Sequence, residues 1–128
     1  MEVVFYEPAL ERLLKSPRSP VGKDLKRRGR LVEAAAKKQA GRRTGALRAS
    51  IHMRHFVDPR GQYVQVGSDL NYALMHHEGT RPHKILPKNG TYLVFTSRGR
   101  LVKALSVNHP GTKPNRYLLD NLVKALIP

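Results

Sequence analysis

A short loop sequence occurs twice in this chain, and it constrains the possible fold more than any other feature. The first copy is His76-His77-Glu78-Gly79-Thr80-Arg81-Pro82-His83, and the shorter second copy is His109-Pro110-Gly111-Thr112-Lys113-Pro114-Asn115. In both, Gly-Thr is followed by a cation and then by proline. Glycine allows backbone angles that other residues avoid, and proline fixes its own φ and extends the residue before it. Both copies are therefore predicted to be shaped loops, suited to binding or assembly.

The length and composition indicate a single domain, residues 1–128, with a modest core. Apolar residues make up 40% of the chain, with no Trp and three Phe, so aliphatic side chains and five Tyr must supply most of the packing. A small core suits a protein that gains stability from neighbouring chains. The absence of cysteine excludes disulfides and thiolate metal sites.

No apolar run approaches the roughly 20 residues that cross a bilayer. The first six residues also lack the basic start and apolar core of a signal peptide. We therefore expect a soluble protein that is made in the cytoplasm and has no membrane partner.

Positive charge is the strongest compositional signal. The chain has 24 Lys and Arg against 9 Asp and Glu, a net charge of +15 with His neutral, which attracts polyanions but says nothing about fold. Residues 23–43 hold nine cations against Asp24 and Glu33, a net of +7. The cations expected to face DNA or an acidic partner are Lys26, Arg27, Arg28, Arg30, Lys37, Lys38, Arg42 and Arg43. The alternative is a solvated outer face of a helix.

The hydrophobic pattern predicts an α+β fold with a mainly antiparallel sheet of four or five strands. Residues 1–20 are expected to form an arm or short helix, and residues 21–40 a long basic helix. Residues 46–107 should form hairpins with an inserted loop: a strand over 47–53 pairs with 62–66 through a turn at Asp58, and 91–96 pairs with 101–107. An amphipathic helix over 115–127, capped by Asn115, should cover the sheet.

The histidines of the loops resemble metal ligands, but their spacing argues against a metal site. Adjacent histidines on a helix point about 100° apart, and no His-Glu-x-x-His sequence is present. Acid-base chemistry needs converging titratable groups, and turn, cap or surface roles explain three of the four acidic residues after residue 48. We therefore predict no catalytic residue, no metal and no cofactor. A nuclease using His77, Glu78 and His109 is the less favoured alternative.

Five segments, taken in order, resemble the family of small tail-component or neck proteins of long-tailed, lambdoid-type bacteriophages. They are Arg43–Ile51, Val66-Gly67-Ser68, Tyr72-Ala73, His77–His83 and His109–Pro114, and they span about residues 40 to 120. Their order is more specific than any one of them. The resemblance implies a non-enzymatic virion protein at the head-to-tail junction, a tail-completion ring of six or twelve copies around the DNA channel. Its partners would be portal-side connector proteins, tail-tube or tail-terminator proteins, and DNA bound without sequence preference.

Under this hypothesis the Gly-Thr loops shape the contacts between copies. The residues expected at that interface are His77, Gly79, Thr80, Arg81, Pro82, His109, Gly111, Thr112, Lys113 and Pro114. The plain alternative is that the glycines and prolines only fold the monomer, as turn residues usually do. At the level of function, the alternatives are a standalone basic nucleic-acid-binding protein and a small nuclease of toxin type.

Overall fold

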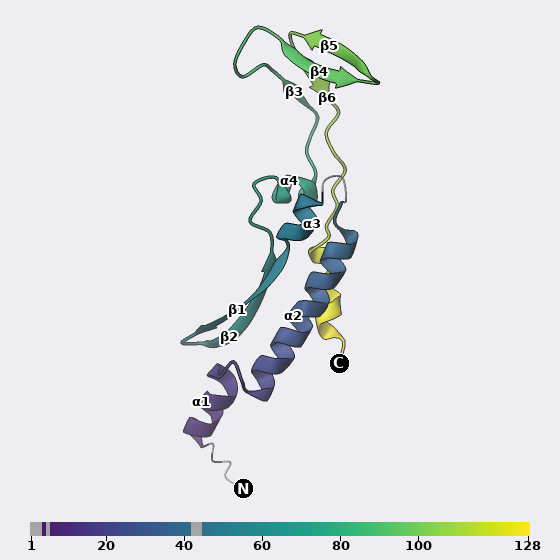
Figure 1. Cartoon of the computed structure of the whole chain (residues 1–128). Coiled ribbons are helices and arrows are strands. Elements are labelled where there is room, and N and C mark those ends of the chain that lie inside the picture. The colour runs from purple at the N-terminus through teal and green to yellow at the C-terminus, as the bar shows by residue number, and fades with distance from the viewer. Residues whose placement is uncertain (1–3, 5, 42–44) are drawn as a thin grey trace. The chain divides into compact units, whose positions relative to one another are not determined.

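The computed structural model describes residue 4, residues 6–41 and residues 45–128 (Figure 1). The helices are α1 (Glu7–Lys15), α2 (Pro20–Gln39), α3 (Ala46–Ser50), α4 (Ala73–Glu78) and the C-terminal 3₁₀ helix η1 (Leu119–Leu126). The strands are β1 (His52–Asp58), β2 (Gly61–Gly67), β3 (His83–Ile85), β4 (Leu93–Ser97), β5 (Arg100–Ala104) and β6 (Val107–His109). Together they confirm the predicted α+β class.

The chain divides into two compact units. Unit 1 comprises Met1–Ala73 and Arg116–Pro128, and unit 2 comprises Leu74–Asn115. Unit 1 contains the long helix, the first hairpin and the C-terminal segment, whereas unit 2 contains both Gly-Thr loops and the second hairpin.

Helix α2 begins where the sequence predicts and packs through its smallest residues. The Ser19 hydroxyl caps it by accepting a hydrogen bond from the Gly22 amide at 3.2 Å, and proline takes the first helical position. A Cβ at Gly29 would overlap the side chains of Val64 and Met53, so glycine allows the β1–β2 hairpin to lie close to the helix. The buried face of α2 consists of Gly22, Gly29, Val32 and Ala36.

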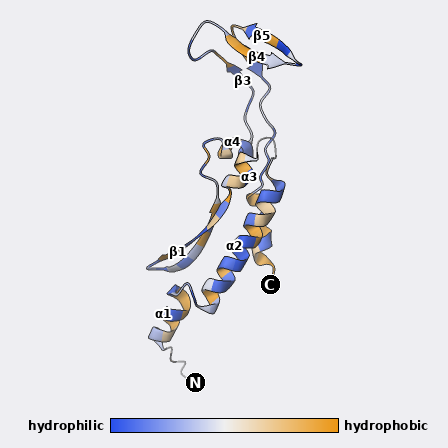
Figure 2. Ribbon diagram, in the orientation of Figure 1, coloured by the Kyte–Doolittle hydropathy of each residue, from blue (hydrophilic) through white to orange (hydrophobic). Residues whose placement is uncertain are grey.

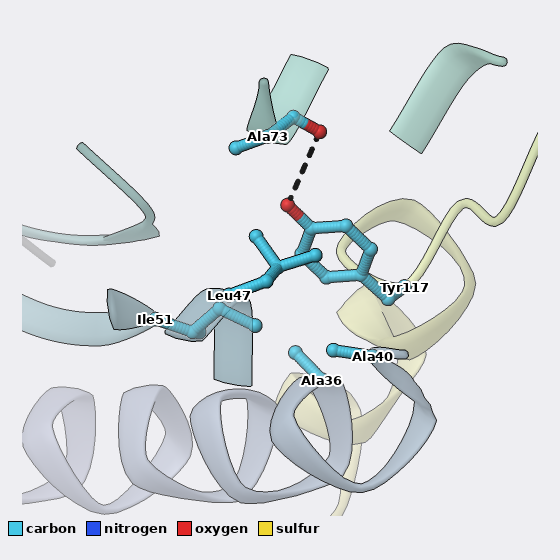
Figure 3. Packing of buried hydrophobic residues seen from close by; sticks show 6 residues of the cluster. All are labelled: Ala36, Ala40, Leu47, Ile51, Ala73 and Tyr117. Atoms are coloured by element: carbon cyan, nitrogen blue, oxygen red, sulfur yellow. Dashed lines mark hydrogen bonds between the residues drawn. The ribbon is translucent and has the colours of Figure 1, made fainter. Parts of the chain in front are cut away.

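The core of unit 1 is small and rich in alanine (Figure 3). Ile51 and Tyr117 are its largest fully buried side chains, and the Tyr117 hydroxyl donates a hydrogen bond to the Ala73 carbonyl at 3.5 Å. Burial raises the pKa of the Tyr117 hydroxyl, because the charged phenolate is disfavoured away from water. The cluster consists of Ala36, Ala40, Leu47, Ile51, Ala73 and Tyr117.

The strand predicted over residues 47–53 is wrong in its first half. The chain forms the short helix α3 there, and β1 begins only at His52. Leu47 and Ile51 are four residues apart, so a helical turn places both on one side, and both enter the core. The apolar residues of this segment therefore fit the four-residue spacing of a helix as well as the alternation of a strand.

The single sheet of four or five strands is also wrong. The six strands form three separate antiparallel pairs, β1–β2, β3–β6 and β4–β5. The expected turn joins β1 to β2, where the Asp58 carboxylate accepts hydrogen bonds from the amides of Arg60 and Gly61 at 2.8 and 3.1 Å. The two predicted hairpins belong to different units, so they do not merge into one sheet.

The predicted C-terminal helix is shorter than expected and of a different type. It is the 3₁₀ segment η1 and begins at Leu119. Asn115 does not cap it, because the Asn115 amide donates to the His76 carbonyl at 3.2 Å and its side chain lies 3.3 Å from the His76 ring. The asparagine therefore joins two parts of unit 2.

Candidate functional site

The two Gly-Thr loops lie against each other and form a pairing that we call the clasp, residues 79–82 and 111–114. Thr80 and Thr112 exchange two backbone hydrogen bonds, each 3.1 Å long, as an antiparallel bridge. Their hydroxyls lie 3.1 Å apart, and the Thr112 amide also donates to the Thr80 hydroxyl at 3.1 Å. The repeated sequence thus supplies both halves of one contact.

The glycines of the clasp are required by space as well as by backbone angle. Gly79 and Gly111 have φ values of +74° and +84°, which favour glycine. A Cβ at Gly79 would overlap the backbone from Thr112 to Pro114, and one at Gly111 would overlap the backbone from Thr80 to Pro82. Each glycine therefore lets its own loop approach the other, and the packing is reciprocal.

The histidines beside the clasp support its backbone. The His109 ring accepts a hydrogen bond from the Gly111 amide at 3.0 Å, and the His83 ring donates to the Arg81 carbonyl at 2.9 Å. The two rings stack across the β3–β6 pair with their centroids 5.0 Å apart. The clasp therefore continues directly into the strands that lead to the β4–β5 hairpin.

Apart from His77 and His109, the predicted interface residues divide into two groups. Gly79, Thr80, Gly111 and Thr112 contact one another within one chain. The rest of the loops turns outward, with Arg81, Pro82, Lys113 and Pro114 all exposed. A role in folding the monomer thus accounts for the first group, while the second group remains available to a partner.

The residues proposed for the nuclease alternative are occupied by local contacts. The His77 ring donates to the Glu78 carboxylate at 2.6 Å, and the His109 ring is bound to the Gly111 amide. Among the residues that the structure describes, no group of three or more His, Asp or Glu side chains gathers to hold a metal ion. Each of the two hydrogen bonds joins groups of the same loop.

A second polar cluster, which sequence reasoning missed, lies between β1 and the segment after β2. The cluster contains a serine, a histidine and an aspartate, which are the residue types of a catalytic triad. The His52 ring, however, donates through Nδ1 to the Ser50 carbonyl at 2.6 Å, and its Nε2 lies 3.5 Å from the Asp69 carboxylate. Arg54 holds that carboxylate at 2.7 Å. In this arrangement the ring nitrogens face a carbonyl and a carboxylate rather than a serine hydroxyl, unlike the histidine of a catalytic triad.

Four of the six predicted cations of α2 are used inside unit 1. Arg27 and Arg28 both bind the Asp24 carboxylate, at 2.9 and 2.5 Å, and the hydrogen bonds from Arg28 and then Arg27 hold the Asp24 pKa below its ordinary value. Lys37 binds Glu33 at 2.6 Å, and Lys26 donates to a loop carbonyl. The positive charge of these residues is thus partly neutralised or tied to the fold.

The remaining cations of α2 form what we call the basic stripe, Lys23, Arg30 and Lys38. Spacings of seven and eight residues place them on one side of the helix over about 22 Å. All three are exposed, and within the described residues none has an ion pair or hydrogen bond from its side chain. Lys23 was absent from the predicted set, and Arg42 and Arg43 lie outside the described residues. The pairings at four-residue spacing were the signal that could have separated the free cations from the paired ones.

Unit 2 carries an excess of positive charge that sequence reasoning did not single out. It has seven cations against one carboxylate, Glu78, a net of +6. In the described part of the chain, none of these cations has a side-chain ion pair or hydrogen bond. They are Arg81, Lys84, Lys88, Arg98, Arg100, Lys103 and Lys113.

Comparison with protein-family models, curated proteins and solved structures finds no match to this chain. None of the helices in the described ranges is long and apolar enough to cross a membrane.

Proposed function

We propose that this chain is a structural protein of the head-to-tail junction of a long-tailed bacteriophage, where copies form a ring around the DNA channel. The ring joins the tail to the head and catalyses no reaction. Its neighbours are connector proteins on the portal side and tail-tube or tail-terminator proteins on the other. The ordered occurrence of the five sequence segments supports this assignment.

The observation that carries the proposal is the balance between buried and exposed apolar side chains. Among the described residues, seven apolar side chains are buried, whereas twenty-three large ones are exposed. Single exposed apolar residues are ordinary on a monomer, but such an imbalance is typical of a chain whose surfaces are covered by neighbours. A ring subunit has two such neighbours, one on each side.

The clasp suits a subunit that must keep its shape. It fixes the base of the β3–β6 and β4–β5 pairs by hydrogen bonds and by close backbone packing rather than by a large core. The exposed cations Arg81 and Lys113 extend from it toward solvent.

The basic stripe on α2 supports a surface turned toward the DNA. Its cations are exposed and unpaired within the described residues, so they are available to phosphates. Contacts of this kind carry no sequence information and weaken as salt is added. A channel lining needs attraction of that unspecific type.

Phage particles lacking this chain provide the direct test. Disrupting its gene should leave DNA-filled heads and complete tails that stay separate in electron micrographs, and added intact protein should restore joined particles. Joined, infectious particles formed in the absence of the chain would contradict the proposal.

The basic stripe also favours a second candidate, a standalone nucleic-acid-binding protein. Such a protein works as a monomer that coats DNA through phosphate contacts. Its size in solution separates the two candidates, because a standalone binder keeps the mass of one chain while a ring subunit assembles.

A further inference from the structure

The β4–β5 hairpin exposes one complete face within its own unit. The register pairs Val94 with Lys103 and Thr96 with Leu101, so these four side chains share a face, which we call the outer face. Val94 is 56% exposed and Leu101 is 70% exposed. Figure 2 shows hydrophobic segments on both strands. A two-stranded ribbon is only marginally stable in water, so this face gains from being covered.

Unit 1 contains a receptive apolar surface, which we call the C-terminal groove. It is a cavity of about 360 Å³ between α2, β2 and the C-terminal segment. Its lining is mostly apolar and has two polar members, Gln62 and Arg28, the latter paired with Asp24. The apolar members are Leu25, Val32, Tyr63, Val64, Val66, Leu118, Leu122 and Ala125. Leu122 lines the groove while 54% exposed, and the neighbouring Val123 and Leu126 are more exposed still. The apolar surface therefore continues from the cavity along η1.

The groove and the basic stripe occupy opposite sides of α2. Leu25 and Val32 line the groove, and at 100° per residue Arg30 and Lys38 lie about 140° from Leu25 in either direction around the helix. A copy of the chain can thus bind a protein on one side of α2 and leave the stripe free for phosphates.

Charge indicates what covers these surfaces. Eight of the nine carboxylates of the chain lie outside unit 2, whose cations are unpaired within the described residues. Lys103 is on the outer face itself. The exposed carboxylate of Asp120 is on η1 beside the groove-lining Leu118 and Leu122, and one of its oxygens accepts a hydrogen bond from the Gln39 side chain at 2.8 Å. The outer face of unit 2, with Lys103, thus complements the C-terminal groove of unit 1, with Asp120 beside it.

We infer that the outer face of one copy docks in the C-terminal groove of the next copy, with Leu101 entering the groove and Lys103 meeting Asp120. Every chain carries both surfaces, so each copy offers its hairpin to one neighbour and its groove to the other. Contacts of this head-to-tail kind generate rings when the rotation closes. The inference rests on the proposed ring and names the surfaces that build it.

Disulfide cross-linking can test this contact without background reactions, because the chain has no cysteine of its own. One batch of full-length protein carries Leu101→Cys, and a second, differently tagged batch carries Leu122→Cys. Mixing them under mild oxidation should give a disulfide-linked dimer containing both tags, since the contact holds the two Cβ atoms near the ~4 Å separation that a disulfide needs. Separate chains ensure that the link is between copies.

The matched control pairs the Leu101→Cys batch with Ala34→Cys, an exposed position nine residues from Leu25 and so on the opposite side of α2 from the groove. The yield with Leu122→Cys should exceed the control yield about tenfold, as expected when a specific contact replaces random collision.

A charge exchange tests the pair of Lys103 and Asp120. Lys103→Glu and Asp120→Lys should each weaken assembly, and mixing the two variants should restore it.

The mass of the unmodified protein separates failure of this inference from failure of the ring. Assembled protein that gives no mixed disulfide above the control, or links only Leu101→Cys chains to each other, overturns the docking mode and leaves the ring standing; the outer face then covers itself or another protein. A monomer that gives no mixed disulfide overturns both. A mixed disulfide from a protein that does not close into rings supports the contact alone.

Discussion

At the scale of single residues, the glycines of the clasp carry the most specific requirement in the chain. Gly79 has φ +74° and meets the backbone of the opposite loop, whereas Gly99, in the turn of the β4–β5 hairpin, has φ +77° and no atom within 4 Å of where a Cβ would lie. Both positions have the same left-handed backbone conformation, but only at Gly79 would an added Cβ meet other atoms. They therefore form a matched pair for substitution.

We expect Gly99→Ala to lower the stability of unit 2 by about 1–2 kcal/mol, the cost of a left-handed residue with a side chain. Gly79→Ala should cost about 1–3 kcal/mol more, because the added methyl group forces the two loops apart. Hydrogen exchange of the hairpin amides measures both. Equal losses for the two variants would show that the loops do not need to touch.

Asp24 gives a pH-dependent contribution whose sign is fixed by its lowered pKa. The carboxylate accepts hydrogen bonds from Arg28 and Arg27, so the stabilisation is present above the ordinary aspartate pKa of about 3.9 and is lost as the pH falls through the lower folded-state value. Asp24→Asn should therefore be less stable than the parent at pH 7. The difference should shrink between about pH 5 and pH 2 in denaturant unfolding. A difference that stays constant would mean that the ion pairs contribute nothing.

At the scale of elements, the sequence predicted what depends on local pattern and missed what depends on distant partners. Helix α2 was expected from its apolar stripe, and both hairpins from their turns. Helix α3 was read as a strand because Leu47 and Ile51 suit either period, and only their place in the core decides. The amide of Asn115 pairs with His76, 39 residues away, which no local rule for helix caps contains.

The candidate site was predicted to the same extent. The Gly-Thr-cation-Pro repeat identified the loops, but their pairing joins residues 32 positions apart. The cations of α2 were visible as a group, yet only the folded helix shows which are bound by Asp24 and Glu33. The sequence therefore identified the loops and the cluster of cations, but it did not show which residue each of them contacts.

The difference between unpaired and paired cations on α2 predicts how DNA binding responds to salt. Replacing both Arg30 and Lys38 by glutamine should reduce the slope of log K against log salt by about 2, near 0.9 for each lost phosphate contact. Lys37→Gln removes the same type of charge from a residue already bound to Glu33 and should change the slope little. Binding titrations with a short DNA duplex measure this. Equal slopes for all variants would contradict a DNA-facing stripe.

At the scale of the whole molecule, charge and apolar surface act in opposite directions. A net charge of +15 per copy makes identical chains repel, while the exposed apolar side chains favour association. Added salt screens the repulsion and leaves the apolar attraction intact. Self-assembly should therefore strengthen as salt rises, in the same range in which DNA binding weakens.

The molar mass of the protein in solution tests the ring most directly. Light scattering on a size-exclusion column, repeated across salt concentrations and with a short DNA duplex, should give a closed assembly of about 86 or 173 kDa, six or twelve times the 14.4 kDa chain. The assembled fraction should grow with salt or with DNA. A mass that stays at 14.4 kDa under every condition would contradict the account.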